Sequence, residues 1–115
     1  MRTRDPRVFL ADALDAVLAI RRFMGGCTSA EYASDVLLRS AVERQFEIVG
    51  EALRRTLAAS PALIGRLPEA PKVIGFRNVL AHGYDTVDND TVYELARAEL
   101  PLLEKRLGAL LEEIS

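Results

Sequence analysis

Residues 35–59, DVLLRSAVERQFEIVGEALRRTLAA, carry the pattern that decides the fold. Their apolar side chains recur every three or four residues, which is the period of an α-helix. One face holds Leu38, Val42, Gln45, Val49 and Ala52, and a second stripe beside it holds Phe46, Gly50, Leu53 and Leu57. A helix that is apolar on more than one side needs more than one packing partner. The segment is therefore expected to pack between other helices.

A glycine stands in the middle of this helix, at Gly50. Inside a helix, glycine costs up to ~1 kcal/mol relative to alanine, because it loses more backbone freedom on folding. That cost indicates that another backbone approaches closely at Gly50.

A helix is also predicted for residues 5–24, before this segment. Asp5 is a suitable cap, and Pro6 falls at the first helical position, where its missing N–H costs nothing. Gly25 and the glycine after it are expected to end the helix. Thr28 and Glu31 then resemble a capping box, and we expect a short turn there before the next helix.

Two more helices are predicted after residue 59. Residues 60–71 hold three prolines and a glycine, so they are expected to form a loop or irregular turns. A short helix follows over residues 71–82, and a long one over about 89–114, where Thr91 and Glu94 read as a capping box. No alternating strand pattern is found. The sequence predicts an all-α, up-and-down bundle of about four to five helices, in a single domain over residues 1–115.

The composition narrows the class of protein. Half of the 115 residues are apolar and 28% are charged, which is typical of a folded domain and not of a disordered chain. The formal net charge of −2 counts against a protein that coats nucleic acid, because such proteins neutralise phosphates with an excess of basic residues. A small local basic site stays compatible with it.

The single cysteine and the single histidine limit the possible chemistry. Cys27 cannot form a disulfide within the chain, and together with His82 it cannot supply a Cys/His zinc site. We therefore expect no metal and no cofactor. The first residues lack the apolar stretch of a signal peptide, and no apolar run reaches the ~20 residues of a membrane span. The expected location is the cytoplasm, with no membrane partner.

The stretch FRNVLAHGY, residues 76–84, gathers polar groups at one helix end. Asn78 and His82 are four residues apart and share a helix face, while Arg77 precedes them and Tyr84 follows on the loop. This set suits cleavage of an RNA phosphodiester, in which the ribose 2'-hydroxyl is an internal nucleophile and no metal is needed. A histidine can move the proton, and an arginine can stabilise charge on the phosphate.

Each of these residues also has a structural interpretation. A histidine after a helix is commonly a surface residue or a cap, an arginine commonly a solvated charge, and a tyrosine commonly half-buried packing. Only the combination favours catalysis. The reaction needs both a general acid and a general base, but each chain has a single histidine. A symmetric dimer would bring two histidines together.

The spacing of arginine, four residues, histidine, one residue and tyrosine resembles the signature of HEPN domains, specifically the HepT-like toxins. The resemblance extends over about residues 5–110, through residues 41–44, 48–52, 73–76, 85–92 and 100–102. The chain lacks the tryptophans that family members often carry, which affects packing more than chemistry.

The resemblance implies a homodimeric ribonuclease whose motif residues face each other across the dimer interface. Arg77 and His82 would be catalytic, and Asn78 and Tyr84 would be supporting residues of the site. The family's partner is an MntA-like nucleotidyltransferase antitoxin, which is implied to neutralise the toxin by attaching AMP to the motif tyrosine, here Tyr84. Added bulk and negative charge at that position would obstruct a phosphate-binding cleft.

Glu43 and Glu51 are further candidates, on the polar stripe of the central helix. One interpretation is a solvated face with ordinary ion pairs, such as Glu51 with Arg55. The other is that Glu43 or Glu51 faces the cleft and orients Arg77 or His82.

An alternative function is a non-catalytic helical module that binds a nucleotide or a partner protein, such as a nucleotidyltransferase. A plain structural bundle is a third possibility, but it leaves the clustered polar motif unexplained. The intact pair of Arg77 and His82 favours the ribonuclease, because a structural module has no physical need of it.

Overall fold

The structure of the protein, a computed structural model, describes residues 5–82 and 87–114, with the side chains of residues 81 and 82 excepted. Five α-helices and one 3-10 helix make up this part of the chain, and it contains no strand. They are α1 (Pro6–Met24), α2 (Ser29–Ser34), α3 (Val36–Ala59), the 3-10 helix η1 (Pro61–Arg66), α4 (Ala70–His82) and α5 (Asn89–Glu113).

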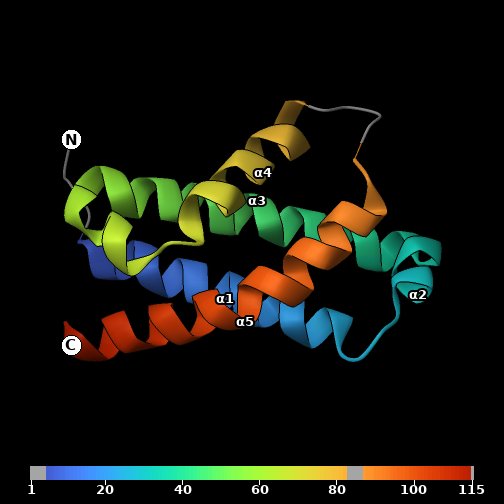
Figure 1. The fold of residues 1–115 in the computed structure, drawn as a ribbon, viewed down its shortest axis with the longest axis horizontal. Coiled ribbons are helices and arrows are strands. Elements are labelled where there is room, and N and C mark those ends of the chain that lie inside the picture. The colour runs from blue at the N-terminus through green and yellow to red at the C-terminus, as the bar shows by residue number, and fades with distance from the viewer. Residues whose placement is uncertain (1–4, 83–86, 115) are drawn as a thin grey trace.

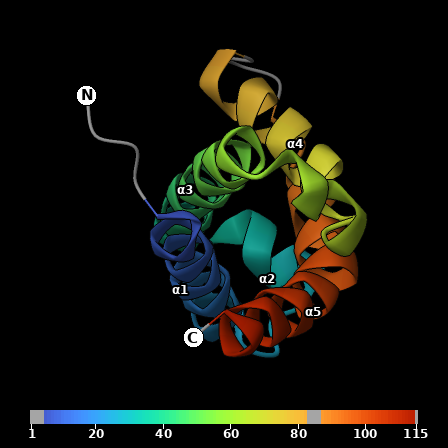
Figure 2. The same cartoon turned by 90° about the vertical axis from the view of Figure 1, so that its left-hand side faces the viewer.

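The long helices run alternately up and down, as predicted. Figure 1 shows α1 and α4 running in one direction along the molecule and α3 and α5 running back. In the end-on view of Figure 2, α1, α3 and α5 surround the core. In the same view, α4 packs on α3 and lies between α3 and α5. The carboxyl end of α4 rises away from the bundle (Figure 1). The residues that follow this end of α4 include the predicted motif tyrosine.

The predicted ends of α1 are confirmed. The Asp5 carboxylate accepts a hydrogen bond of 2.9 Å from the backbone N–H of Arg7, and Pro6 begins the helix. At the other end, Gly25 adopts a φ of 51°, in the left-handed region that favours glycine. Local sequence chemistry alone is enough to set both ends.

The connection between α1 and α3 differs from the prediction. The capping box is present, with hydrogen bonds of 2.8 Å from the Thr28 N–H to the Glu31 carboxylate and 3.1 Å from the Glu31 N–H to the Thr28 hydroxyl. It begins a six-residue helix, α2, where a turn was expected. The difference arises from tertiary packing, because Tyr32 of α2 is fully buried and its ring lies 6.2 Å from that of Tyr93.

Two further details of the prediction need correction. The proline-rich stretch contains the regular 3-10 helix η1, which Pro61 can begin because the first helical residues need no N–H partner. The cap of α5 is Asp88, and not Thr91: the Asp88 carboxylate accepts hydrogen bonds from the Asp90 N–H at 3.1 Å and from the Thr91 hydroxyl at 3.0 Å. An aspartate one residue before the helix satisfies the first-turn donors directly.

The centre of the bundle is α3, which packs on α1 and on α4 as its two apolar stripes predict. Phe46 of α3 and Phe76 of α4 meet edge to face, with ring centroids 5.4 Å apart and planes at 82°. This is a favoured geometry for aromatic pairs. Because Phe76 directly precedes Arg77, the pair fixes the part of α4 that carries the motif.

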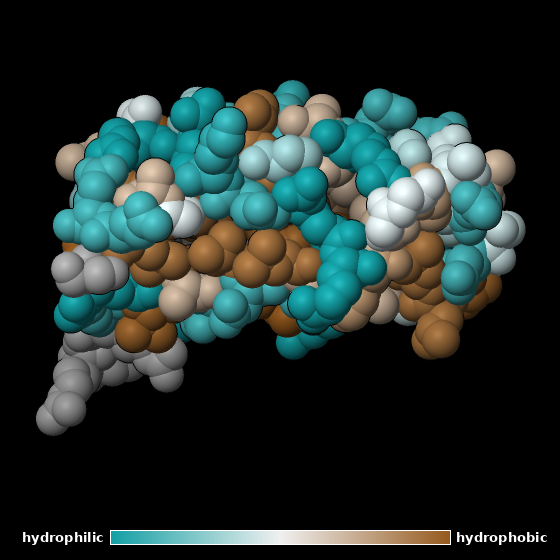
Figure 3. All heavy atoms as spheres, turned by 90° about the horizontal axis from the view of Figure 1, so that it is seen from below, coloured by the Kyte–Doolittle hydropathy of each residue, from teal (hydrophilic) through white to brown (hydrophobic). Residues whose placement is uncertain are grey.

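Some large apolar side chains stay on the surface. Figure 3 shows apolar side chains gathered along the face that α1 and α5 form on the lower side of Figure 1. Exposed large apolar residues on these two helices include Leu18, Phe23 and Leu102. In the described part of the chain, no helix combines the length and the apolar character that crossing a membrane requires.

Candidate functional site

The position of Arg77 depends on the glycine of α3. A Cβ atom placed on Gly50 would lie 2.3 Å from the Cβ and 2.8 Å from the Cγ of Arg77, and 3.4 Å from the carbonyl oxygen of Val73. Only glycine lets α4 come this close to α3, which confirms the close approach predicted at Gly50. The arginine stem therefore crosses the α3 backbone directly, and its guanidinium emerges with about 31% of the side chain exposed.

The carboxylate of Glu51 lies beside this guanidinium. Its Oε1 atom is 3.5 Å from a terminal nitrogen of Arg77, and the same carboxylate binds Arg54 and Arg55. The hydrogen bonds from Arg54 and Arg55, followed by the charges of Arg54 and Arg77, lower the pKa of Glu51 to about 2. Glu51 is thus ionised at neutral pH and bound to three arginines. The predicted ion pair with Arg55 is present, and Glu51 also contacts Arg77.

Asn78 is the second neighbour of the arginine. A terminal nitrogen of Arg77 donates a hydrogen bond of 3.1 Å to the Asn78 side-chain oxygen. Asn78 and Glu51 therefore hold the guanidinium from α4 and from α3. The backbone of His82 ends α4, one turn beyond Asn78, but its side chain and the whole of Tyr84 lie outside the described residues.

Glu43 lies in a different environment. It is half-buried on α3, two turns before Glu51 and toward α2. Burial raises the pKa of Glu43, and the charges that act on it belong to Arg39 and Glu47. Glu43 also raises the pKa of Tyr32, although burial is the larger cause. The structure thus brings Glu51, and not Glu43, to Arg77.

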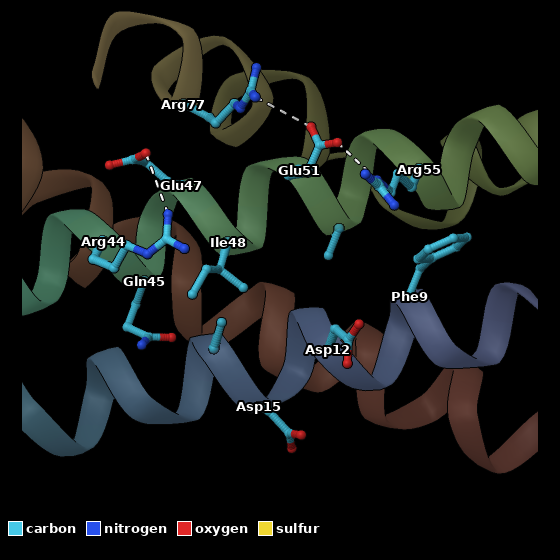
Figure 4. A pocket seen from close by; sticks show the side chains of 12 residues that line it. Phe9, Asp12, Asp15, Arg44, Gln45, Glu47, Ile48, Glu51, Arg55 and Arg77 are labelled. Carbon is cyan, nitrogen blue, oxygen red and sulfur yellow. Dashed lines mark hydrogen bonds and ion pairs between the residues drawn. The ribbon is translucent and has the colours of Figure 1, made fainter. Parts of the chain in front are cut away.

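A groove of about 480 Å³ runs between α1 and α3 beneath Arg77 (Figure 4). Asp12 and Asp15 of α1 line one side, and Arg55 and Ile48 of α3 line the other. Its charges are therefore mixed, with acids opposite the arginines. In the close-up, Arg77 reaches over the rim from α4 toward Glu51.

The contact of Glu51 with one further arginine was not predicted from the sequence. Arg54 binds Glu51 through two hydrogen bonds, of 2.9 Å to Oε1 and 2.7 Å to Oε2. The spacing of three residues from Glu51 on a helix could have identified this contact. Among residues 5–82 and 87–114, no group of three or more acidic, histidine or cysteine side chains is arranged to hold a metal ion.

The chain is similar to several known proteins over nearly its whole length. Its identity is 29% to a protein of Methanocaldococcus jannaschii named as a "putative RNase", covering 99% of this chain and 93% of that one. A second protein of that organism with this description is 28% identical over 93% of this chain and 97% of its own. A "putative RNase" of Caldanaerobacter subterraneus is 26% identical, covering 96% and 97%.

No solved structure matches the chain significantly. The family model described as "Ribonuclease HepT-like" matches residues 13–110, a span that includes α3, α4 and the motif from Arg77 to Tyr84. The chain belongs to the HepT-like ribonuclease family.

Proposed function

We propose that this protein is the toxin of a toxin–antitoxin pair, a metal-independent endoribonuclease that acts on cytoplasmic RNA as a homodimer. The observation that carries the proposal is the arginine of α4 at the point where that helix crosses α3. Arg77 is part-exposed, lies 3.5 Å from Glu51 and binds Asn78, in a chain of the HepT-like ribonuclease family. His82, the only histidine, follows within the same helix.

In the proposed reaction the ribose 2'-oxygen attacks the adjacent phosphorus. The bond from the 2'-oxygen to phosphorus forms, the bond from phosphorus to the 5'-oxygen breaks, and a 2',3'-cyclic phosphate results. His82 takes the 2'-hydroxyl proton, and a protonated His82 supplies the proton that the leaving 5'-oxygen needs. Arg77 stabilises the charge that grows on the phosphoryl oxygens.

A second copy of the chain supplies the second histidine. If two α4 ends face each other in a symmetric dimer, one His82 acts as the base while the other acts as the acid. The exposed apolar side chain of Val79, one turn before His82, supports this arrangement, because a second copy would cover it.

The antitoxin in this proposal is a nucleotidyltransferase that adds AMP to Tyr84. The phenolic oxygen attacks the α-phosphorus of a nucleoside triphosphate, a new phosphodiester forms and pyrophosphate leaves. The added nucleotide brings bulk and negative charge, which would obstruct a phosphate-binding site and keep RNA from it.

The decisive experiment is cleavage of transfer and messenger RNA by the purified dimer, shown by intact mass to be unmodified, in EDTA. We expect wild type to cleave and His82→Ala to be inactive with unchanged helical content. Cleavage that EDTA abolishes would overturn the metal-independent mechanism. Cleavage by neither protein on any RNA would favour a non-catalytic module that binds a nucleotide or a partner.

The dimer and the modification have separate tests. Cleavage is expected only from the dimer, so equal activity in a proven monomer would contradict the shared site. Coexpression with a cognate nucleotidyltransferase should add AMP-sized mass increments to wild type and none to Tyr84→Phe. Increments that persist in Tyr84→Phe would place the acceptor elsewhere.

A further inference from the structure

The site at Arg77 contains more positive charge than the family motif accounts for. One carboxylate, that of Glu51, is shared by Arg54, Arg55 and Arg77. A single negative charge cannot neutralise three guanidinium groups. Glu47 does not compensate, because it forms its own ion pair with Arg44 at 3.8 Å. At Glu51 itself, arginine charge therefore exceeds carboxylate charge, whereas Asp12 and Asp15 line the opposite, α1 side of the groove.

Arg54 and Arg77 converge on the same atom. The Nε of Arg54 donates to the Oε1 of Glu51 at 2.9 Å, and a terminal nitrogen of Arg77 lies 3.5 Å from that same Oε1. The two guanidinium groups are therefore neighbours, although they come from α3 and α4. A phosphate that reaches Arg77 also lies within reach of Arg54.

Arg55 shares the other oxygen of this carboxylate, Oε2, with Arg54. Its Nε donates to Oε2 at 2.9 Å, and its guanidinium lies 5.9 Å from the ring centre of Phe9 on α1. It lines the groove that contains Asp12 and Asp15, whose charges repel an anion. Arg77 also lines this groove and Arg54 does not, but Arg54 is the arginine that shares Oε1 of Glu51 with Arg77. This shared atom favours Arg54 over Arg55 as the second ligand of phosphate.

Arg54 can exchange its partner. Its side chain is about 52% exposed, and ion pairs this exposed are held weakly. An arginine fork binds phosphate oxygens in the same two-pronged way as carboxylate oxygens. A phosphate can therefore take the place of Glu51 on Arg54.

We propose that Arg54 is a second phosphate-binding residue of the site, which binds the backbone of the RNA substrate next to the phosphate at Arg77. Glu51 is then a positioning residue that sets the spacing of the two guanidinium groups in the absence of RNA. This inference rests on the ribonuclease activity proposed above.

The test measures binding of a fluorescent single-stranded RNA by anisotropy, at several salt concentrations, with all variants in a His82→Ala background that cannot cleave. Arg54→Gln should weaken binding about tenfold, as loss of a charged hydrogen-bonded contact does. It should also lower the slope of log K against log salt by about 0.7. Arg54→Lys should restore the slope but only part of the affinity, because it keeps the charge and loses the fork.

Arg55→Gln is the matched control. Arg55 is next in sequence, equally exposed and bound to the same carboxylate, so this change also removes a contact to Glu51. Its RNA affinity and salt slope should equal those of the parent. Equal weakening by Arg55→Gln would mean that support of Glu51 is what matters, and it would overturn the proposal.

Cleavage assays on proteins that retain His82 separate this inference from the proposed function. Arg54→Gln is expected to raise KM about tenfold with little change in kcat, because it removes a binding contact remote from the proton transfers. If wild type cleaves RNA and Arg54→Gln has the same KM as wild type, only the proposed role of Arg54 is refuted. Wild type that neither binds nor cleaves RNA would refute both proposals.

Discussion

Replacing Gly50 with alanine tests the central contact of the structure. The new Cβ would lie 2.3 Å from the Cβ of Arg77, whereas carbon atoms pack best at about 3.5–4.0 Å. The contact is to the stem of Arg77 next to its backbone, so α4 must move by about 1 Å. Overpacking of this kind costs ~1–3 kcal/mol, and the better helix propensity of alanine returns up to ~1 kcal/mol.

The expected outcome is a small loss of stability with a large loss of activity. A net cost of about 1 kcal/mol corresponds to a fall in Tm of about 4 °C for a domain of this size. A displacement of about 1 Å at a catalytic group can lower the rate by about 10²-fold. At a temperature where wild type and Gly50→Ala are both folded, the cleavage rate of Gly50→Ala should therefore be far below that of wild type.

Gly108→Ala provides the control, since a Cβ at Gly108 of α5 would meet nothing within 4 Å. There the propensity gain of up to ~1 kcal/mol should appear alone, with unchanged cleavage. If Gly50→Ala behaved like Gly108→Ala, more stable and fully active, the close contact of α4 with α3 at Gly50 would be wrong.

The stability of the protein in acid should depend on the charge of Glu51, whose pKa of about 2 lies below the ordinary 4.5. The stability that this carboxylate contributes is complete above pH 4.5 and is lost as the pH falls toward 2. The difference in Tm between wild type and Glu51→Gln should narrow over that window, and a constant difference would contradict the ion pairs. Phe46→Ala should lower the free energy of unfolding in urea by ~3–5 kcal/mol, because Phe46 is fully buried against Phe76; a loss below ~1 kcal/mol would contradict this packing. Arg106→Gln should cost ~1–3 kcal/mol in the same assay, because it removes the 2.7 Å partner of the buried Glu69 carboxylate, and adding Glu69→Gln should recover part of the loss.

Most of the fold could be predicted because its determinants are local. The apolar period of residues 35–59, the cap at Asp5 and the glycine stop at Gly25 each act within a few residues along the chain. The helix α2 could not be predicted in the same way. Six residues are too few for a stable helix of their own, and α2 depends on burial of Tyr32 against Tyr93, which is 61 positions away in the sequence.

The candidate site could be predicted in part for the same reason. The spacing of arginine, histidine and tyrosine identified the segment that contains Arg77, and the unfavourable Gly50 indicated a close neighbour without identifying it. The choice between Glu43 and Glu51 could not be made from the sequence, because both lie on one stripe of α3. That choice depends on where α4 crosses α3, which is a property of tertiary packing.

The point where α4 crosses α3 also explains why the stability of the fold and the proposed function depend on the same residues. Gly50 and Glu51 are adjacent in the chain, and they act on opposite ends of the same side chain: Gly50 admits the stem of Arg77, and Glu51 lies at its guanidinium. A helix without Gly50 would be intrinsically more stable by up to ~1 kcal/mol, yet it could not bring Arg77 over α3 to that carboxylate. The unfavourable glycine is thus accounted for by the position of the arginine, and we expect selection for stability alone to remove it and selection for RNA cleavage to retain it.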